Sequence, residues 1–452
     1  MEEKKTVIND GIYDARTLGT PKMLVLGLQH MFAMFGATVL VPTLTGLSVS
    51  ATLLFAGLGT LLFHLLAKGK VPAFLGSSFV FLAGYFAIAP NGERELLPYA
   101  CFGVMVAGLR YLVLAAFFKV FGMKKVMRFF PPIVTGPIII AIGLSLSGSA
   151  ITNCSANWGI ALVAIAIVIG FNIWGKGMAK IIPILLGVIG SYLVAAVTGN
   201  VDFTAVKEAA WIGMPFQMQD TVFGLFAGEV DKGLLLTAVI TIAPLSLATM
   251  TEHIGDMCAI SSTCERNYIE DPGFHRTLMG DGLATALASV FGAPANTTYG
   301  ENTGVLALSK VYDPRVIRIA AVLAIIFSFC PKFSALIASM PTATIGGVSL
   351  VLYGMISAVG VRNVVENHVD FTNSRNVIIA ALILVLAIGV SYTGNIMIPI
   401  GNITLTLTGL AVAALTGILL NAILPGKDYD FDQEHKGSTS VNFHVGGNPE
   451  AK

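Results

Sequence analysis

The sequence predicts an all-α polytopic membrane protein with fourteen transmembrane segments in two inverted repeats of seven. Three observations predict this fold class. The 452 residues are 55% hydrophobic and 12% charged, about half the charged share of a soluble domain. Apolar runs of the length that a bilayer requires recur along the whole chain. Lysine and arginine gather in alternate connections between these runs, as the positive-inside rule describes.

The segments follow from apolar runs of roughly 20 residues, some of them shortened or interrupted. We expect residues 1–21 to form an N-terminal tail, 22–198 the first repeat and 199–232 a long outside loop. Residues 233–424 form the second repeat, and the polar tail 425–452 is predicted to be disordered. The fourteen predicted segments are 23–44, 51–67, 73–88, 99–118, 133–146, 158–174, 181–197, 234–259, 278–291, 296–308, 316–329, 336–359, 377–390 and 403–424.

The charges of the connections predict the orientation of the chain. With both termini in the cytoplasm, 22 of the 27 Lys and Arg residues lie on the inside and four on the outside, and Arg110 lies within a segment. This bias supports an even number of crossings and cytoplasmic termini. The N-terminus is charged and polar, which is not typical of a signal peptide.

Composition also argues against several classes of protein. The net charge of +1 gives no general attraction to nucleic acid. The five cysteines are scattered and lack CxxC spacing, so we expect neither a disulfide framework nor a zinc site.

Two of the apolar segments are interrupted at their centres. Residues 294–304 are polar, rich in Thr and Gly, and carry Glu301 between apolar flanks. Residues 72–80 interrupt the third segment in the same way. Non-helical backbone at membrane depth is tolerated where protein or a water-filled cavity surrounds it, and paired interruptions indicate the binding site of a transporter.

An internal echo relates the two interrupted segments. Gly57-Leu-Gly-Thr60 precedes the first interruption and Gly282-Leu-Ala-Thr285 precedes the second, 225 residues later. Seven segments is an odd number, so the second copy enters the membrane upside down, as in many secondary transporters.

Two carboxylates are predicted to share one face of the eighth segment. Glu252 and Asp256 are four residues apart, which places them on the same side of a helix. Like charges in a medium of low dielectric disfavour double ionisation, so we expect at least one to hold a proton near neutral pH. This favours proton coupling through Glu252, with Asp256 and His30 next in line. A second interpretation for Asp256 is a solvated or backbone-bonded position near the cytoplasmic end.

Other ionisable residues within the segments have simpler interpretations. His64 and Arg110 are expected to be structural, paired or snorkelling. Asp281 lies near a predicted segment end, where a helix cap is the favoured interpretation. His253 directly follows Glu252 and invites comparison with a hydrolase, but HExxH and GxSxG motifs are lacking in the sequence.

The interrupted segments and the carboxylates predict the kind of ligand. Chain breaks expose amide donors, and Glu252 and Glu301 accept N–H groups or, when protonated, donate to carbonyls. Phe79 and Tyr299 either stack on a ring or pack within the protein. The predicted ligand is a polar, planar solute that is neutral or weakly acidic.

Several motifs resemble the nucleobase–ascorbate transporter family (nucleobase:cation symporter-2), and above all its bacterial uracil permeases. The resemblance runs from the first segment to the twelfth. The motifs are Gln29-His30 within residues 28–42, Gly76-Ser-Ser-Phe79, 181–184, Glu252-His253, 271–275, Asn296-Thr-Thr-Tyr-Gly-Glu-Asn-Thr-Gly304 and 346–354.

This resemblance implies both an architecture and a binding site. Segments 1–4 and 8–11 would form a core domain and segments 5–7 and 12–14 a gate domain, with short strand-like pieces in segments 3 and 10. Uracil would meet Glu252, Glu301 and the backbone at Phe79 and Gly300. The pocket would also be lined by Ala37, Tyr299 and Tyr353.

The implied function is uracil import by proton symport through alternating access, in a bacterial cytoplasmic membrane. The resemblance implies no enzyme activity and no cofactor beyond the proton, and it leaves a homodimer open. Glu301 favours uracil because xanthine permeases usually have Gln at this place. Asp256 departs from the uracil permeases, which have His there, so a xanthine or uric acid permease stays as the alternative. An inorganic-anion carrier and a channel are less favoured, and sodium is an alternative coupling ion.

Overall fold

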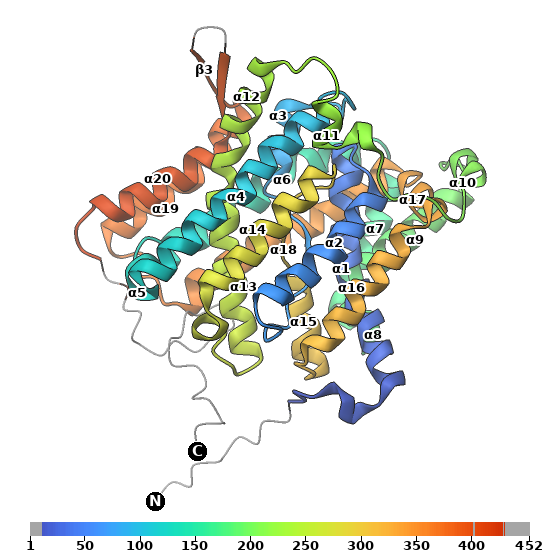
Figure 1. Cartoon of the computed structure of the whole chain (residues 1–452), viewed down its shortest axis with the longest axis horizontal. Helices are drawn as coiled ribbons and strands as arrows, with labels where there is room; N and C mark the ends of the chain where they lie inside the picture. The colour runs from blue at the N-terminus through green and yellow to red at the C-terminus, as the bar shows by residue number, and fades with distance from the viewer. Residues whose placement is uncertain (1–10, 401–402, 428, 430–452) are drawn as a thin grey trace, which may run out of the picture.

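The computed structural model describes residues 11–400, 403–427 and 429, and the side chains of Ala37 and Glu301 lie outside this description. The chain is a mostly helical, multi-pass membrane protein (Figure 1). Among the described residues, seven helices are long and apolar enough to cross a membrane, or eight if one bent pair is a single span. The seven are α1 (Thr20–Thr45), α2 (Val49–Leu66), α4 (Leu97–Phe121), α6 (Pro132–Ser155), α12 with α13 (Lys232–Thr263), α18 (Thr342–Glu366) and α19 (Ser374–Tyr392).

Shorter helices complete the bundle. The bent pair is α16 (Pro314–Ser328) and α17 (Pro331–Ala338), whose axes meet at 87°. Three further apolar helices are α7 (Trp158–Trp174), α9 (Pro183–Val197) and α20 (Gly409–Ile423), and α14 (Phe274–Val290) carries more polar residues. The remaining helices are η1 (Ala15–Leu18), α3 (Leu82–Ile88), α5 (Met123–Met127), α8 (Met178–Ile181), α10 (Thr204–Glu208), η2 (Met218–Asp220), α11 (Val222–Leu225), η3 (Ala243–Leu245), η4 (Ile269–Gly273) and α15 (Gly300–Ser309).

Side-chain caps explain where several of these helices begin. Ser48 accepts from the amide of Ala51 at the start of α2, and Asp231 accepts from Gly233 and Leu234 at the start of α12 (Lys232–Ile242). Such caps satisfy amide groups that have no partner within the helix. η3, which contains Pro244, separates α12 from α13 (Ser246–Thr263) because proline cannot donate a helical hydrogen bond.

The helices form two groups that pack mostly within themselves. In the first group, α2 packs on α16, α4 packs on α14, and α2 and α14 contact each other. In the second group, α6 packs on α18, α7 packs on α9, and α19 packs on α20. Large apolar side chains are exposed along outward helix faces, as expected for contact with lipid. Examples are Val113 and Phe117 of α4, Leu162 and Ile173 of α7, and Val322 and Ile326 of α16.

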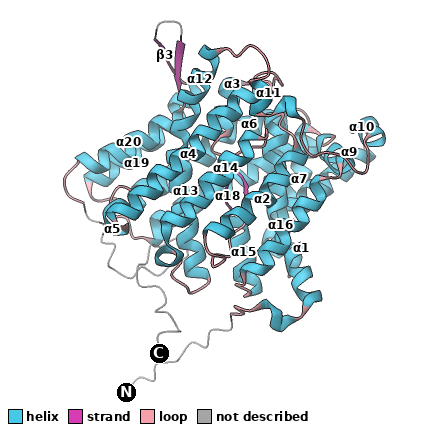
Figure 2. Ribbon diagram, in the orientation of Figure 1, coloured by secondary structure: helices cyan, strands magenta, loops and turns pink. Residues whose placement is uncertain are grey.

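Two small antiparallel sheets lie in different surroundings. β1 (Leu75–Ser77) pairs with β2 (Asn296–Thr298) in the middle of the bundle, where every residue of both strands is buried. β3 (Ile396–Ile400) pairs with β4 (Ile403–Leu407), and this hairpin projects from one end of the bundle (Figure 2). The strand-like pieces expected in the third and tenth segments are therefore present.

Several predicted segment boundaries are wrong, and three of them have a clear physical reason. Segment 403–424 begins with β4, because Thr alternates with Ile and Leu there in the two-residue period of a strand. Segment 336–359 divides between α17 and α18, since Pro341 lies outside both as the N-cap of α18. Segment 278–291 starts at Phe274, directly after Gly273, whose φ of 91° ends the preceding turn. The predicted disordered tail falls almost wholly outside the described residues.

Candidate functional site

The paired strands β1 and β2 form the centre of the candidate site. The register places Leu75 opposite Thr298, Gly76 opposite Thr297, and Ser77 opposite Asn296. α3 follows β1 after a short turn, and α15 follows β2 at once. Each interrupted segment is therefore a three-residue strand joined to a short helix, and both helices start beside the sheet.

The echoed Gly-Leu-x-Thr sequences hold these strands in place. The Thr60 hydroxyl accepts from the Leu75 amide at 2.9 Å and donates to the Leu75 carbonyl at 3.3 Å. The Thr285 hydroxyl donates to the Asn296 carbonyl of β2. Each threonine thus binds the strand of its own half, which satisfies backbone groups that would otherwise be buried without partners.

The glycines of the same echo allow close helix packing. A Cβ on Gly57 would lie 2.5 Å from the Ala321 carbonyl oxygen of α16. A Cβ on Gly282 would lie 2.4 Å from Tyr111 Cβ of α4. Both distances are shorter than van der Waals contact, so these helix pairs require glycine here, as is common between membrane helices.

Tyr299 stabilises the strand pair. Its side chain is buried, its hydroxyl donates to the Ser77 carbonyl at 2.8 Å, and it accepts from the Thr38 hydroxyl of α1 at 3.3 Å. A Cβ on Gly76 would lie 2.6 Å from the Tyr299 ring. The Tyr299 ring therefore packs closely against Gly76, where a side chain would collide with it.

Of the two carboxylates predicted on α13, Asp256 lies beside the start of α15. Glu252 and Asp256 are both half-buried, while His253 and Ile254 between them are buried. Asp256 Oδ2 accepts from the Thr298 hydroxyl of β2 at 3.0 Å, and a Cβ on Gly300 would lie 3.6 Å from Asp256 Oδ1. Asp256 is thus bonded to the side chain of an interrupted segment rather than simply solvated at a helix end.

Asp281 and His253 form a buried polar pair that the sequence did not indicate. Both side chains have no exposed surface, and His253 Nδ1 lies 3.2 Å from Asp281 Oδ2. Thr277 lies 3.1 Å from His253 Nε2, and the Thr297 hydroxyl donates to Asp281 Oδ2 at 3.3 Å. The helix-cap interpretation of Asp281 is wrong, because α14 begins seven residues earlier and places Asp281 in its interior. An aspartate between two glycines inside an apolar run was the available signal.

His30 contacts α15 from the side of α1. The side chain is fully buried, and the Asn302 amide donates to His30 Nδ1 and to the His30 carbonyl, both at 3.2 Å. Because Nδ1 accepts, a neutral His30 carries its proton on Nε2, which has no partner in the part of the chain that the structure describes. His64 is structural, as expected, and its Nε2 lies 2.9 Å from the Ala73 carbonyl just before β1.

Phe79 and Tyr353 meet where the two helix groups face each other. Their rings lie 5.7 Å apart at 78°, an edge-to-face geometry. Phe79 belongs to the turn after β1 and Tyr353 to α18, and both are buried. Of the other predicted site residues, Gly300 is the exposed first residue of α15, whereas the side chains of Ala37 and Glu301 lie outside the described part.

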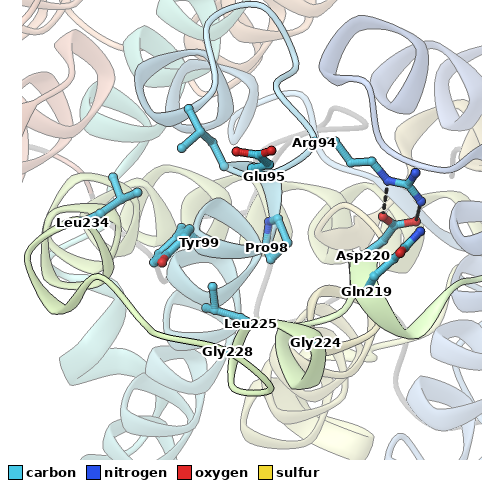
Figure 3. A pocket seen from close by; sticks show the side chains of 11 residues that line it. Arg94, Glu95, Pro98, Tyr99, Gln219, Asp220, Gly224, Leu225, Gly228 and Leu234 are labelled. Atoms are coloured by element: carbon cyan, nitrogen blue, oxygen red, sulfur yellow. Dashed lines mark hydrogen bonds and ion pairs between the residues drawn. The ribbon is translucent and has the colours of Figure 1, made fainter.

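A cavity of about 510 Å³ lies away from this site, at the end of the bundle that carries α11. Its lining includes Glu95, Tyr99 and Leu225, and Arg94 forms an ion pair with Asp220 at 2.6 Å on its rim (Figure 3). The described residues hold no group of three His, Cys, Asp or Glu side chains placed to bind a metal ion. The five cysteines are free thiols.

Comparison with known proteins identifies the family. A model of the family described as "Permease family" (Xan_ur_permease) matches residues 21–396. The chain belongs to this permease family. The permease is 41% identical to "Uracil permease" of Bacillus caldolyticus, over 92% of this chain and 94% of that protein. It is 38% identical to "Uracil permease" of Bacillus subtilis (strain 168), over 98% and 100%. For "Uracil permease" of Escherichia coli (strain K12) the identity is 36%, over 88% and 90%.

Solved structures of more distant proteins share the fold of the permease. The transmembrane domain of the cyanobacterial bicarbonate transporter BicA has a TM-score of 0.60 at 16% identity, over 85% of this chain and 98% of that domain. SLC26A9 has a TM-score of 0.61 at 13% identity, over 91% and 66%. At these identities the likeness concerns the fold alone. The curated relatives named above are all permeases.

Proposed function

We propose that this permease imports uracil by proton symport through alternating access. The observation that carries the proposal is the contact of Asp256 of α13 with the second interrupted segment, because Asp256 accepts from the Thr298 hydroxyl and a Cβ on Gly300 would lie 3.6 Å from its carboxylate. The relatives named uracil permease, at 36–41% identity over most of the chain, support the choice of substrate.

The proposed site matches the polar edge of uracil, on which N–H and C=O groups alternate. Glu252 and Glu301 would accept N–H groups, and the backbone at Phe79 and Gly300 would meet the remaining edge. Ala37, Tyr299 and Tyr353 would line the faces of the ring. The Phe79–Tyr353 contact supports this arrangement because it joins the turn directly after β1 to α18 of the second helix group.

We further propose fourteen crossings in two inverted repeats, with a core and a gate domain. The matched packing of the helices supports the repeats: α2 on α16 corresponds to α14 on α4, and α7 on α9 corresponds to α19 on α20. The first group of helices would be the core and the second group the gate. The boundaries proposed are 22–198 and 233–424, with the loop 199–232 between them.

The proton would be carried by Glu252. A proton that binds Glu252 from the outside neutralises the loaded site and favours the change to the inward-facing state. Release of this proton at the higher pH of the cytoplasm then returns the carrier to its starting state. Asp256 and His30 are the next candidates, and Asp256 has the stronger support because it contacts β2 directly.

Uptake of radiolabelled uracil into proteoliposomes tests the function. We expect saturable uptake that rises as the outside pH falls, and no modification of the substrate. Stronger transport of xanthine or uric acid than of uracil would favour the purine alternative that Asp256 suggests. Uptake that follows a sodium gradient at constant pH would overturn proton coupling, and non-saturable flux would indicate a channel.

Glu252→Gln tests the proton role, because the amide imitates the protonated carboxyl. The variant should exchange uracil across equal concentrations but should not accumulate it when a pH step is applied. Accumulation equal to the wild type would move the coupling role to Asp256 or His30.

The proposed orientation, in a bacterial cytoplasmic membrane, places both termini in the cytoplasm. Single cysteines at Lys124 and Asn157 in a cysteine-less background test it with an impermeant reagent on intact cells. We expect labelling at Asn157, and labelling at Lys124 alone would reverse the orientation. Light scattering of the purified protein measures whether it assembles as the homodimer that the family resemblance leaves open.

A further inference from the structure

We propose that two clasps, one at each end of the bundle, position the half-helices α3 and α15 and so keep the binding site in shape. The N-terminal clasp consists of residues 11–19 on residues 310–315. The loop clasp consists of residues 217–231 on residues 93–99. The inference rests on the proposed function for its effect on binding, but the clasps themselves are read from contacts in the structure.

The N-terminal clasp begins with backbone hydrogen bonds. The Ile12 amide donates to the Lys310 carbonyl, and the Tyr312 amide donates to the Ile12 carbonyl, both at 2.8 Å. Lys310 ends α15 in a left-handed conformation with φ of 53°. The chain preceding α1 therefore forms a short strand pairing with the linker that leaves α15.

Asp313 anchors this clasp. It is 2% exposed and accepts from the Ala15 amide at 2.7 Å, from the Arg315 amide at 2.9 Å and from Arg315 Nη1 at 3.0 Å. The same guanidinium nitrogen donates to Asp14 at 3.0 Å. A buried carboxylate that receives several hydrogen bonds holds its neighbours far more firmly than an exposed ion pair does.

Tyr13 extends the clasp to a second helix. Its hydroxyl donates to the carbonyl of Cys264, the C-cap of α13, at 2.8 Å. The Arg266 guanidinium lies 4.1 Å from the Tyr13 ring centre, and the Tyr312 ring lies 5.4 Å away. The N-terminal clasp thus joins the ends of α13 and α15, the two helices that carry Glu252 and Glu301.

The loop clasp repeats this arrangement at the opposite end of the bundle. Arg94 donates through Nε and Nη2 to the two oxygens of Asp220, at 2.6 and 2.9 Å (Figure 3). Arg94 Nη2 also donates to Gln217 at 2.9 Å. The Asp231 amide donates to the Tyr99 hydroxyl at 3.0 Å. Arg94 lies in the linker that leaves α3, just as Asp313 lies in the linker that leaves α15.

The half-helices need such support because of their length. α3 has seven residues and α15 has ten, and helices shorter than about 12 residues are marginal by themselves. Their N-terminal ends face the strand pair and their C-terminal ends are held by the clasps. A half-helix released at one end would change the position of the amides at its other end.

Hydrogen exchange and uracil binding of the purified full-length protein test the proposal. The test variants are Tyr13→Ala and Asp313→Asn, the second of which retains an amide able to cap α16. Arg16→Gln is the matched control, because Arg16 pairs with Asp14 inside the same segment. We expect faster exchange at residues 302–306, beyond the direct contacts, and a Kd for uracil raised about tenfold, the effect of losing roughly one hydrogen bond to a charged group. The control should match the wild type.

Breaking the loop clasp should change hydrogen exchange less than breaking the N-terminal clasp, since the Arg94 side chain is largely exposed. We expect Arg94→Asp to speed exchange at residues 82–88 and the double variant Arg94→Asp, Asp220→Arg to restore it. Unchanged exchange of α15 in both N-terminal variants would overturn the proposal, as would a lower melting temperature with unchanged exchange and Kd. If the wild type does not bind uracil, the proposed substrate fails and the exchange measurements still decide the positioning role.

Discussion

The two interrupted segments lead from a three-residue strand into a half-helix, but their side chains differ in kind. α3 reads Leu-Ala-Gly-Tyr-Phe-Ala-Ile, and the turn before it carries Phe79, Val80 and Phe81. α15 begins Gly-Glu-Asn-Thr-Gly and follows a strand of Asn-Thr-Thr. One break is apolar and the other is polar, although their backbones take the same course.

The neighbours of the two breaks repeat this difference. α2, behind β1, has Ala56 where α14, behind β2, has Asp281 at the position 225 residues later. Asp281 then gathers His253 and Thr297 into a buried polar cluster. Buried ionisable groups are costly in a membrane protein, so a single set beside one break serves function at a lower cost than two sets. The repeated scaffold therefore supplies shape, and one half supplies the charge.

The largest expected effect comes from removing the buried carboxylate. Asp281→Ala removes the carboxylate partner of the buried His253 and should lower the free energy of unfolding by about 3 kcal/mol or more. Ala56→Gly, at the matching position of the other half, should cost about 1 kcal/mol. Thermal unfolding of the purified variants in detergent measures both, and equal losses would contradict the asymmetry.

The next effect concerns the strand pair itself. Gly76→Ala places a Cβ 2.6 Å from the Tyr299 ring and from the Thr38 hydroxyl, so we expect a loss of about 1–3 kcal/mol in unfolding free energy. Gly148→Ala in α6 is the control, because a Cβ there meets open space. That control should be neutral or slightly stabilising, and a Gly76→Ala variant as stable as the wild type would contradict the close packing of Tyr299 and Thr38 against Gly76.

Substitutions at the two breaks should also differ in their effect on uracil affinity. Glu301→Gln replaces an acceptor by a donor at the polar break and should weaken uracil binding by about 1–3 kcal/mol. Phe79→Leu at the apolar break should cost less than about 1.5 kcal/mol. Calorimetry measures both values, and a larger loss for Phe79→Leu would reverse the assignment of specificity to the second half.

The smallest expected effect concerns a feature that both halves share, the threonine hydroxyl that binds each strand. Thr60→Val and Thr285→Val each remove one hydroxyl that binds the strand of its own half. Each should lower the unfolding free energy by about 0.6 kcal/mol, the average for a hydrogen bond between membrane helices. The loss should be somewhat larger for Thr60→Val, because Thr60 makes two hydrogen bonds to its strand and Thr285 makes one. A loss in only one of the two variants would show that the threonines do not have matching roles.

Much of the site could be predicted from the sequence because it depends on order along the chain. The lengths of apolar runs located the helices, the two interruptions located the breaks that hold β1 and β2, and the family resemblance implied their strand-like form. The echo of glycine and threonine predicted that the interruptions correspond, and in the structure Thr60 and Thr285 contact their strands. The same reasoning missed β4, since a strand whose residues alternate between Thr and Leu or Ile is also apolar enough to count as a membrane segment.

The sequence by itself determined that the chain is a multi-pass membrane protein with two corresponding interruptions, because composition and spacing are properties of the chain alone. The tertiary structure decided which polar groups meet. Asp256 binds Thr298, and Asp281 binds His253, across separations of 42 and 28 residues. No periodicity specifies such partners, because they depend on how α13 and α14 pack around a strand that is held by residues from the other half of the chain.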